Sequence, residues 1–407
     1  MQNTHPKGVT GRRRRNEERT AARITSVDRA RRVAHRRVPL PVESYVEGGA
    51  GEESTLRANL AAVRSVLFRP HLGVTSGAAP DLRTSVLGQD ISMPVLLSPV
   101  GFTRMMHTSG DLAGAAAAGD AGTVFTLSSM SGHSMEEVMA AARGPLWFQV
   151  YFLGGREGAR RLVGDARRLG YSAVVVTMDT QIPGDRRREA RFGLSPPLRL
   201  DRRTVTRMAR FVALRPRWLL DQAQHGFRLD LVNAQRGASG GSSGSASEAL
   251  LQWIAEPPTW DDLSWIREEF QGDVIVKGVL FPDDAKRAVD HGASAVIVSN
   301  HGGRQLDGVP ATFDVLPAIV GAVAGQAEVL VDGGIRSGAD VVRARALGAQ
   351  AAMIGRAWAY GLCAAGRPGV DRILALIRGD IDRTLRLLGL DSVEAINRSC
   401  LAAPTAG

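Results

Sequence analysis

The chain has 407 residues, of which 44% are hydrophobic and 23% charged, an ordinary balance for a globular protein with a large core. This composition excludes a wholly disordered chain, a collagen and a membrane-spanning bundle. Two cysteines, Cys363 and Cys400, are too few for a disulfide framework or a zinc cluster. We therefore expect a cytoplasmic protein without a metal site.

The positive charge is concentrated at the start of the sequence. Residues 1–38 contain 12 lysines and arginines but only three acidic residues, within a net charge of +10 for the whole chain. No aromatic residue interleaves with these arginines, which argues against a nucleic-acid partner. No apolar run follows Arg12–Arg15, so an export signal is not expected. We predict that residues 1–24 form a basic, disordered tail.

Eight short apolar runs, rich in β-branched residues, follow one another along the chain. They begin near Pro94, Thr123, Leu146, Ala173, Val274, Ala295, Glu328 and Ala351. Continuous apolar runs are typical of parallel strands buried on both faces, and helical patterns lie between most of them. The sequence therefore predicts an α/β fold, a (β/α)₈ TIM barrel over residues 25–390. A C-terminal helix over 370–390 would complete it, with a tail over 391–407. A doubly wound open sheet is less favoured because the first run lacks its glycine signature.

The interval after the fourth run is too long for one helix and two loops. It contains an insertion over about 194–258, with a flexible Gly/Ser-rich stretch at 237–247. The segment Arg199–Leu220 mixes seven arginines with large apolar residues. Such a segment is typical of an active-site lid or of a surface that lies on an anionic membrane. Both interpretations stay open, and the second places the protein peripherally at the inner face of the membrane.

Chemically active side chains follow the predicted strands at their carboxyl ends, where active sites form in this kind of barrel. They are Gln149 and Tyr151 after the third strand, Thr177 and Asp179 after the fourth, Lys277 in the fifth, and Ser299, His301 and Arg304 after the sixth. A histidine titrates near neutral pH and can act as a general base. Asp179 is a candidate to hold its imidazole, and the guanidinium groups of Arg186 and Arg304 match a carboxylate.

The last two strands carry a phosphate-binding pattern. Glycines after these strands expose backbone N–H groups, and nearby arginines complete an anion site. The residues concerned are Asp332, Gly333, Gly334 and Arg336 after the seventh strand, and Gly355 and Arg356 after the eighth. Two such loops on consecutive final strands indicate a phosphorylated ligand.

The stretch Ser299-Asn300-His301-Gly302-Gly303-Arg304-Gln305-Leu306-Asp307 resembles the active-site signature of the FMN-dependent L-2-hydroxy acid dehydrogenases and oxidases. This family includes L-lactate dehydrogenase, glycolate oxidase and mandelate dehydrogenase. Further motifs match in order: Tyr45 with Glu47-Gly48-Gly49-Ala50, Gln149-Val150-Tyr151, Thr177-Met178-Asp179-Thr180, Lys277-Gly278, Asp332-Gly333-Gly334-Ile335-Arg336 and Gly355-Arg356. The resemblance covers roughly residues 25–390, apart from the middle of the insertion.

The resemblance implies a role for each matching position. His301 would be the catalytic base paired with Asp179, and Lys277 would stabilise the reduced flavin. The substrate would be bound by Tyr45, Tyr151, Arg186 and Arg304. The FMN cofactor would be held by Pro99, Val100, Gly101, Ser128, Gln149, Thr177, Lys277, Ser299, Asp332, Gly333, Gly334, Arg336, Gly355 and Arg356.

The implied reaction is oxidation of a small, lactate-like L-2-hydroxy acid to the 2-oxo acid, by a homotetramer or homo-octamer. Gly101 resembles the dehydrogenase branch, so we expect a quinone or another non-oxygen acceptor. Two alternatives stay open: an oxygen-using oxidase that forms hydrogen peroxide, and a flavin oxidoreductase that acts on a larger peptide or natural product. Met130 and Pro183 stand at positions expected to shape the side-chain pocket.

Overall fold

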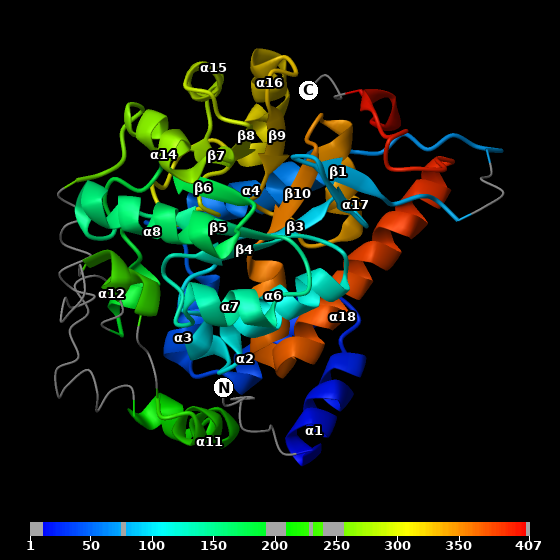
Figure 1. Cartoon of the computed structure of the whole chain (residues 1–407). Coiled ribbons are helices and arrows are strands. Elements are labelled where there is room, and N and C mark those ends of the chain that lie inside the picture. The colour runs from blue at the N-terminus through cyan, green and yellow to red at the C-terminus, as the bar shows by residue number, and fades with distance from the viewer. Residues whose placement is uncertain (1–10, 75–78, 193–208, 228–230, 239–255, 404–407) are drawn as a thin grey trace.

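Eight parallel strands close into a barrel in the computed structural model, which describes residues 11–74, 79–192, 209–227, 231–238 and 256–403 (Figure 1). Around the barrel the strand order is β10-β3-β4-β5-β6-β7-β8-β9. Their bounds are β3 Val95–Leu97, β4 Phe125–Ser128, β5 Leu146–Val150, β6 Ala173–Thr177, β7 Asp273–Val279, β8 Ala295–Val298, β9 Glu328–Val331 and β10 Ala351–Ile354. Each predicted apolar run contributes one strand, so the prediction of a (β/α)₈ barrel is confirmed.

Helices follow the strands and form the outer layer of the barrel (Figure 1). Their bounds are α5 Thr103–Met106, α6 Gly110–Asp120, α7 Met135–Ala141, α8 Gly155–Leu169, α9 Arg187–Ala190, α14 Asp262–Phe270, α15 Pro282–Asp290, α16 Thr312–Val323, α17 Gly338–Ala346 and α18 Arg356–Leu388. One apolar cluster fills the space between barrel and helices. A second fills the barrel interior, where Trp147, Ile275 and Met353 are almost fully buried.

A β-hairpin closes the amino-terminal end of the barrel. Its strands β1 (Thr84–Val86) and β2 (Gln89–Ile91) pair antiparallel, and Val86 and Ile91 join the interior cluster. The backbone N–H of Leu87 donates to Glu328 at the start of β9, over 2.9 Å. The hairpin thus covers the amino-terminal end of the barrel and leaves the carboxyl ends of the strands for a ligand site.

The N-terminal segment is folded where the sequence predicted disorder. In the described residues, four helices precede the barrel: α1 Gly11–Ala22, α2 Val27–Arg37, α3 Leu40–Glu47 and α4 Ser54–Ser65. The prediction of a disordered tail over 1–24 is therefore wrong for residues 11–24, while residues 1–10 lie outside the described residues. Ala21 and Ile24 are buried in the structure, and Arg13 forms ion pairs with Glu17 and Asp221. These contacts compensate for the high charge of the helix.

The two ends of the fold meet on the outside of the barrel. Helices α1 and α2 pack on α18, which is interrupted at Ala365 and Gly366 by non-helical backbone angles. Beyond α18, the segment 391–403 contains a short 3₁₀ helix, Arg398–Cys400, and Leu401 forms a β-bridge with Phe68. The described part of the predicted C-terminal tail is therefore docked on the body.

The insertion is described in two pieces, α11 (Pro216–Gln224) and α12 (Val232–Ala238). The arginine-rich stretch up to residue 208 and most of the Gly/Ser-rich stretch lie outside the described residues. Helix α11 is attached to α5, because Trp218 Nε1 donates to the carbonyl of Met105 and Gln222 Nε2 to that of Arg104, both over 2.8 Å. None of the helices in the described residues combines the length and apolar character that crossing a bilayer requires.

Candidate active site

A cavity opens at the carboxyl ends of the barrel strands. Together with its mouth, which is open to solvent, it encloses about 840 Å³. Its walls come from α3, from the loop after β3, and from the ends of β5 to β10. Of the predicted site residues it brings together Tyr45, Pro99, Val100, Gly101, Gln149, Tyr151, Thr177, Lys277, His301, Arg304, Asp332, Gly333, Gly334, Arg336, Gly355 and Arg356.

The acid–base pair is assembled from two neighbouring strand ends. His301 Nδ1 lies 3.2 Å from Asp179 Oδ1, and His301 Nε2 lies 3.3 Å from the Tyr151 hydroxyl. A carboxylate only accepts hydrogen bonds, so Nδ1 carries the proton and Nε2 is left as the base. Burial lowers the pKa of His301, and the Asp179 charge opposes that effect. The imidazole is therefore neutral, and ready to accept a proton, at physiological pH.

His301 is held in an uncommon backbone conformation. Its φ angle is +58°, a left-handed value that costs about 1–3 kcal/mol for a residue other than glycine. Its backbone N–H donates to Ser299 Oγ over 3.1 Å. This bond and the contact with Asp179 fix the ring in place. Such strain is typical of residues that are positioned for function.

Lys277 places a buried positive charge on the wall of the cavity. Its side chain is 5% exposed, and Nζ donates to Ser299 Oγ over 2.8 Å and lies 3.4 Å from Asp332 Oδ2. The pairing reduces the cost of burying an ammonium group. Ser299 does not line the cavity itself, so its predicted contact with the cofactor becomes an indirect one through Lys277 and His301.

A row of hydrogen bonds crosses β4, β5 and β6 at the same level. Ser128 Oγ donates to Gln149 Oε1, and Gln149 Nε2 donates to Thr177 Oγ1, both over 3.0 Å. These two bonds fix the orientation of the Gln149 side-chain amide, with its oxygen toward Ser128 and its nitrogen toward Thr177. Ser128 was predicted to contact the cofactor, but it is not part of the cavity wall; in the structure its hydroxyl bonds to the Gln149 amide.

The two arginines that were predicted to bind the substrate are joined by a carboxylate that was not predicted. Arg304 Nη2 donates to Glu189 Oε1 over 2.7 Å, and Arg186 Nη1 lies 3.8 Å from Glu189 Oε2. Glu189 is 1% exposed. Arg304 also donates to the Tyr45 carbonyl over 2.6 Å and lies over its ring, 4.7 Å from the centroid. Arg186 does not line the cavity, because Nη2 donates instead to Gln305.

The opposite end of the cavity offers an anion site. Arg356 is half-buried, and within the described part of the chain its guanidinium donates to three backbone carbonyls, those of Val46, Gly48 and Gly302, over 2.7–2.9 Å. Burial lowers its pKa to about 10. Among the described residues, neither Arg356 nor Arg336 has a carboxylate partner within 4.0 Å. Two guanidinium groups beside glycine backbone at Gly333 and Gly334 suit a phosphate.

The residues present fit FMN. Ser98 Oγ and Asp332 Oδ1 are buried without a hydrogen-bond partner among the described residues, and both residues line the cavity. Buried polar atoms need partners, and a polyhydroxyl chain between the anion site and Lys277 would supply them. The cavity wall also includes residues that the sequence analysis did not single out for the site, namely Val46, Ser98, Met106, Gly302, Ile335, Met353 and Ala359.

Comparisons with known proteins agree with this geometry. The model of the family described as FMN-dependent dehydrogenase matches residues 34–403. A pre-mycofactocin synthase of Mycobacterium tuberculosis is 42% identical over 380 residues, which is 92% of this chain and 94% of that protein. An L-lactate dehydrogenase of Alcaligenes faecalis is 41% identical over 379 residues, 93% of this chain and 98% of that protein.

Solved structures extend the likeness to three dimensions. The monotopic membrane protein (S)-mandelate dehydrogenase is 35% identical, with a TM-score of 0.85 over 93% of this chain and 99% of that one. A mandelate oxidase is 33% identical, with a TM-score of 0.76 over 93% and 98%. The family model spans most of the sequence, and the residues that line the cavity fit a flavin nucleotide. This chain therefore belongs to the FMN-dependent dehydrogenase family.

Proposed function

We propose that the protein oxidises a small L-2-hydroxy acid to the corresponding 2-oxo acid, with FMN as the first electron acceptor. The observation that carries the proposal is that one cavity is lined by both a neutral histidine, His301, and the guanidinium group of Arg304. His301 Nε2 and Arg304 both face the cavity, and Lys277 lies on its wall. Relatives named for lactate and mandelate support this reaction class.

In this proposal the substrate carboxylate binds Arg304 and Tyr45, whose ring lies under the Arg304 guanidinium. Glu189 already orients that guanidinium group. His301 Nε2 accepts a proton from the substrate, and Asp179 stabilises the imidazolium that results. Tyr151 lies beside the base and contacts the substrate oxygen. Bound FMN would accept the two electrons. Lys277 would compensate the negative charge of the reduced ring, and Arg336 and Arg356 would bind the phosphate.

A non-oxygen electron acceptor, such as a quinone, is part of the proposal. The resemblance of Gly101 to the dehydrogenase branch rests on the absence of a Cβ. A Cβ at Gly101 would lie 2.9 Å from Met130 Cβ and 3.3 Å from the Tyr45 hydroxyl. Met130 thus occupies the space that an alanine would need. We expect slow formation of hydrogen peroxide during turnover in air, and a fast rate would favour the oxidase alternative.

A peripheral membrane contact through α11 also belongs to the proposal. Leu214 and Leu220 are 68% and 58% exposed, and the arginines at 215 and 217 lie between them in sequence. Apolar side chains beside cations suit an anionic bilayer surface, and the mandelate dehydrogenase neighbour is described as a monotopic membrane protein. Sedimentation with anionic vesicles at low salt tests this contact, which Leu214→Gln should weaken.

A larger substrate is the second candidate. The relative named pre-mycofactocin synthase favours it, and so do two exposed apolar side chains on the adjoining loops after β6 and β8, Ile182 and Leu306. These loops are joined, because Gln305 Nε2 donates to the Ile182 carbonyl over 3.0 Å. An extended substrate would cover both side chains, whereas lactate would reach neither.

A substrate series separates the two candidates. The FMN-loaded protein is mixed with L-lactate, D-lactate, glycolate, L-mandelate and longer 2-hydroxy acids, and dye reduction and 2-oxo acid formation are followed. We expect activity with the L-forms only, and its loss in His301→Gln, which should retain FMN. A yellow protein that none of these acids reduces would favour the larger substrate.

A further inference from the structure

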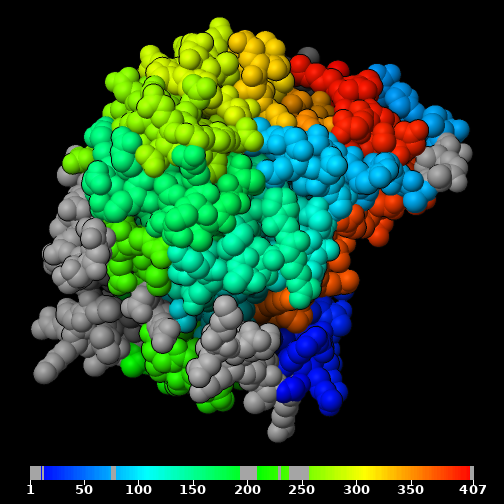
Figure 2. Space-filling model, in the orientation of Figure 1, coloured from blue at the N-terminus to red at the C-terminus, as the bar shows by residue number. Residues whose placement is uncertain are grey.

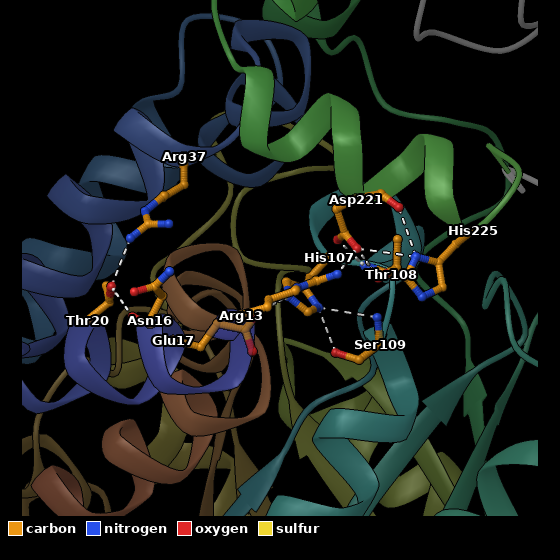
Figure 3. Close-up of polar contacts among 10 residues, drawn as sticks. All are labelled: Arg13, Asn16, Glu17, Thr20, Arg37, His107, Thr108, Ser109, Asp221 and His225. Atoms are coloured by element: carbon orange, nitrogen blue, oxygen red, sulfur yellow. Dashed lines mark hydrogen bonds and ion pairs between the residues drawn. The ribbon is translucent and has the colours of Figure 1, made fainter. Parts of the chain in front are cut away.

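A second cavity adjoins the active site on the far side of Met106. It lies where α1, the end of α2, the loop between α5 and α6, helix α11 and helix α18 meet (Figure 3). Met106, which is 1% exposed, lines both cavities. None of the residues proposed above to bind FMN or substrate lines the second one. Its use is therefore not explained by the oxidation reaction.

The inner wall of this cavity is apolar. Met106, Cys363 and Ala364 are at most 5% exposed. Trp218 adds an indole ring whose Nε1 is already bonded to the Met105 carbonyl. His107 also lines the cavity and lies against the break in α18. The two are so close that a Cβ at Gly366, where φ is +58°, would meet the imidazole ring at 2.8 Å. An apolar group would be sheltered here.

Charged side chains line one side of the cavity and are paired with one another (Figure 3). Arg13 forms ion pairs with Glu17 and Asp221. His107 Nε2 lies 3.3 Å from Glu17, and Thr108 Oγ1 donates to Asp221 over 2.8 Å. Burial raises the pKa of both carboxylates, but these partners outweigh it, and each pKa lies below its usual value. Both carboxylates are therefore ionised and already paired.

Two arginines on the same cavity have no such partner. Arg37 donates to Thr20 Oγ1 over 2.8 Å, and Arg217 has no carboxylate within 4.0 Å among the described residues. Burial lowers the pKa of Arg37, and repulsion from Arg217 lowers it further. Three arginines thus face the cavity against two carboxylates. A second anion would balance this excess of positive charge.

We propose that this cavity binds an amphipathic anion. Its phosphate or carboxylate head lies between Arg37 and Arg217. Its apolar tail lies against Trp218, Met106 and Cys363. A lipid headgroup with its acyl chain and a soluble fatty or aromatic acid share this chemistry. The proposal is independent of the substrate assigned to the first cavity.

Calorimetric titration of the full-length, FMN-loaded protein tests the proposal. The probes are octyl phosphate, inorganic phosphate and the neutral detergent octyl glucoside, each below its micelle concentration. We expect one site for octyl phosphate and at least about tenfold weaker binding of the other two. Arg37→Gln and Arg217→Gln should each weaken octyl phosphate about tenfold, the loss of one charge-assisted contact. Arg36→Gln, which removes the same charge one residue away on an exposed side chain, should bind like the wild type.

Fluorescence places the ligand independently of affinity. Octyl phosphate should change the tryptophan emission of the wild type. The change should vanish in Trp218→Phe, which keeps the apolar ring, while calorimetry still records binding. Equal weakening by all three arginine variants, or a fluorescence change that survives in Trp218→Phe, would overturn the proposal. Thermal unfolding and FMN content show whether each variant is folded. If Arg37→Gln does not fold, Arg217→Gln provides the test, because the Arg217 side chain is exposed.

Vesicles of phosphatidylglycerol separate the two sources of the ligand. Vesicle binding that Arg37→Gln and added octyl phosphate both abolish would support the cavity and identify a lipid headgroup. One-site binding of octyl phosphate, with vesicle binding that these changes leave intact, would support the cavity and identify a soluble acid. Vesicle binding without any octyl phosphate site would contradict the cavity and leave only a surface contact.

Discussion

The pair formed by His301 and Asp179 gives a prediction whose size follows from the geometry. The two side chains are 19% and 14% exposed, and Nδ1 and Oδ1 are 3.2 Å apart. At such a separation the attraction between two unit charges is worth about 5 kcal/mol at an effective dielectric constant of about 20. Asp179→Asn removes this stabilisation when the imidazole becomes protonated in the transition state. After relaxation of the new amide we expect a loss of about 3–4 kcal/mol, or about 10²–10³ in the rate of flavin reduction.

The same substitution should move the pH profile in a defined direction. Burial lowers the pKa of His301 and the Asp179 charge raises it, so removal of that charge lowers the pKa further. A base must be neutral to act, so the rate rises with pH through this pKa. The rising limb of the variant should therefore lie at lower pH than that of the wild type, with a lower plateau. Anaerobic stopped-flow reduction between pH 5 and 9 measures both. If the plateau rate of the variant equals that of the wild type, or if its rising limb lies at higher pH, the assignment of Asp179 as the partner of the base would be refuted.

Three further substitutions test other parts of the account. Glu189→Gln leaves Arg304, whose side chain is 12% exposed, without its carboxylate, so unfolding should occur at lower temperature and a 2-oxo acid should restore more stability than in the wild type; a smaller ligand-induced shift would contradict this. Gly334→Ala should lose FMN, because φ there is +88° and a Cβ would meet a backbone oxygen of α4 at 2.5 Å; full FMN content after purification would argue against it. The Asp307 carboxylate accepts backbone N–H bonds at the start of α4, which hold its pKa well below the usual value despite the opposing effect of burial. Asp307→Asn should therefore cost about 1–2 kcal/mol at pH 7, a difference that shrinks as the pH falls below about 4; a constant difference in chemical denaturation would be inconsistent with that origin.

The barrel could be predicted because strands buried on both faces have a strong sequence pattern. The runs near Ala173 and Val274 are continuous and β-branched, and both form barrel strands. The hairpin that plugs the barrel escaped prediction because each of its strands has only three residues. With so few positions, apolar alternation cannot be separated from chance.

Helix α1 escaped prediction for a different reason. Composition alone favoured disorder, since Arg13 and its neighbours are strongly charged. The compensation comes from Asp221, more than 200 residues away in sequence, and from packing on α18. Long-range ion pairs of this kind leave no mark on the local sequence.

The candidate site was largely predictable, because parallel strands bring their carboxyl ends together. That rule and the resemblance placed His301 and Lys277 near each other before any coordinates. Glu189 was missed because it follows three arginines in a segment that also suits a solvated surface. A carboxylate three residues after Arg186 was the available signal. Which arginine faces the cavity is decided by the pairings of Glu189 and Gln305, which are tertiary contacts.

Reduction of the bound flavin without oxygen tests the central claim most directly. The yellow, FMN-loaded protein is mixed anaerobically with L-lactate, L-mandelate and longer L-2-hydroxy acids, and with the D-forms as controls. The account predicts that at least one L-acid bleaches the flavin absorbance within a single turnover, that its D-form does not, and that His301→Gln stays yellow. A protein that binds FMN yet stays yellow with every acid, or one bleached equally by both enantiomers, would contradict it.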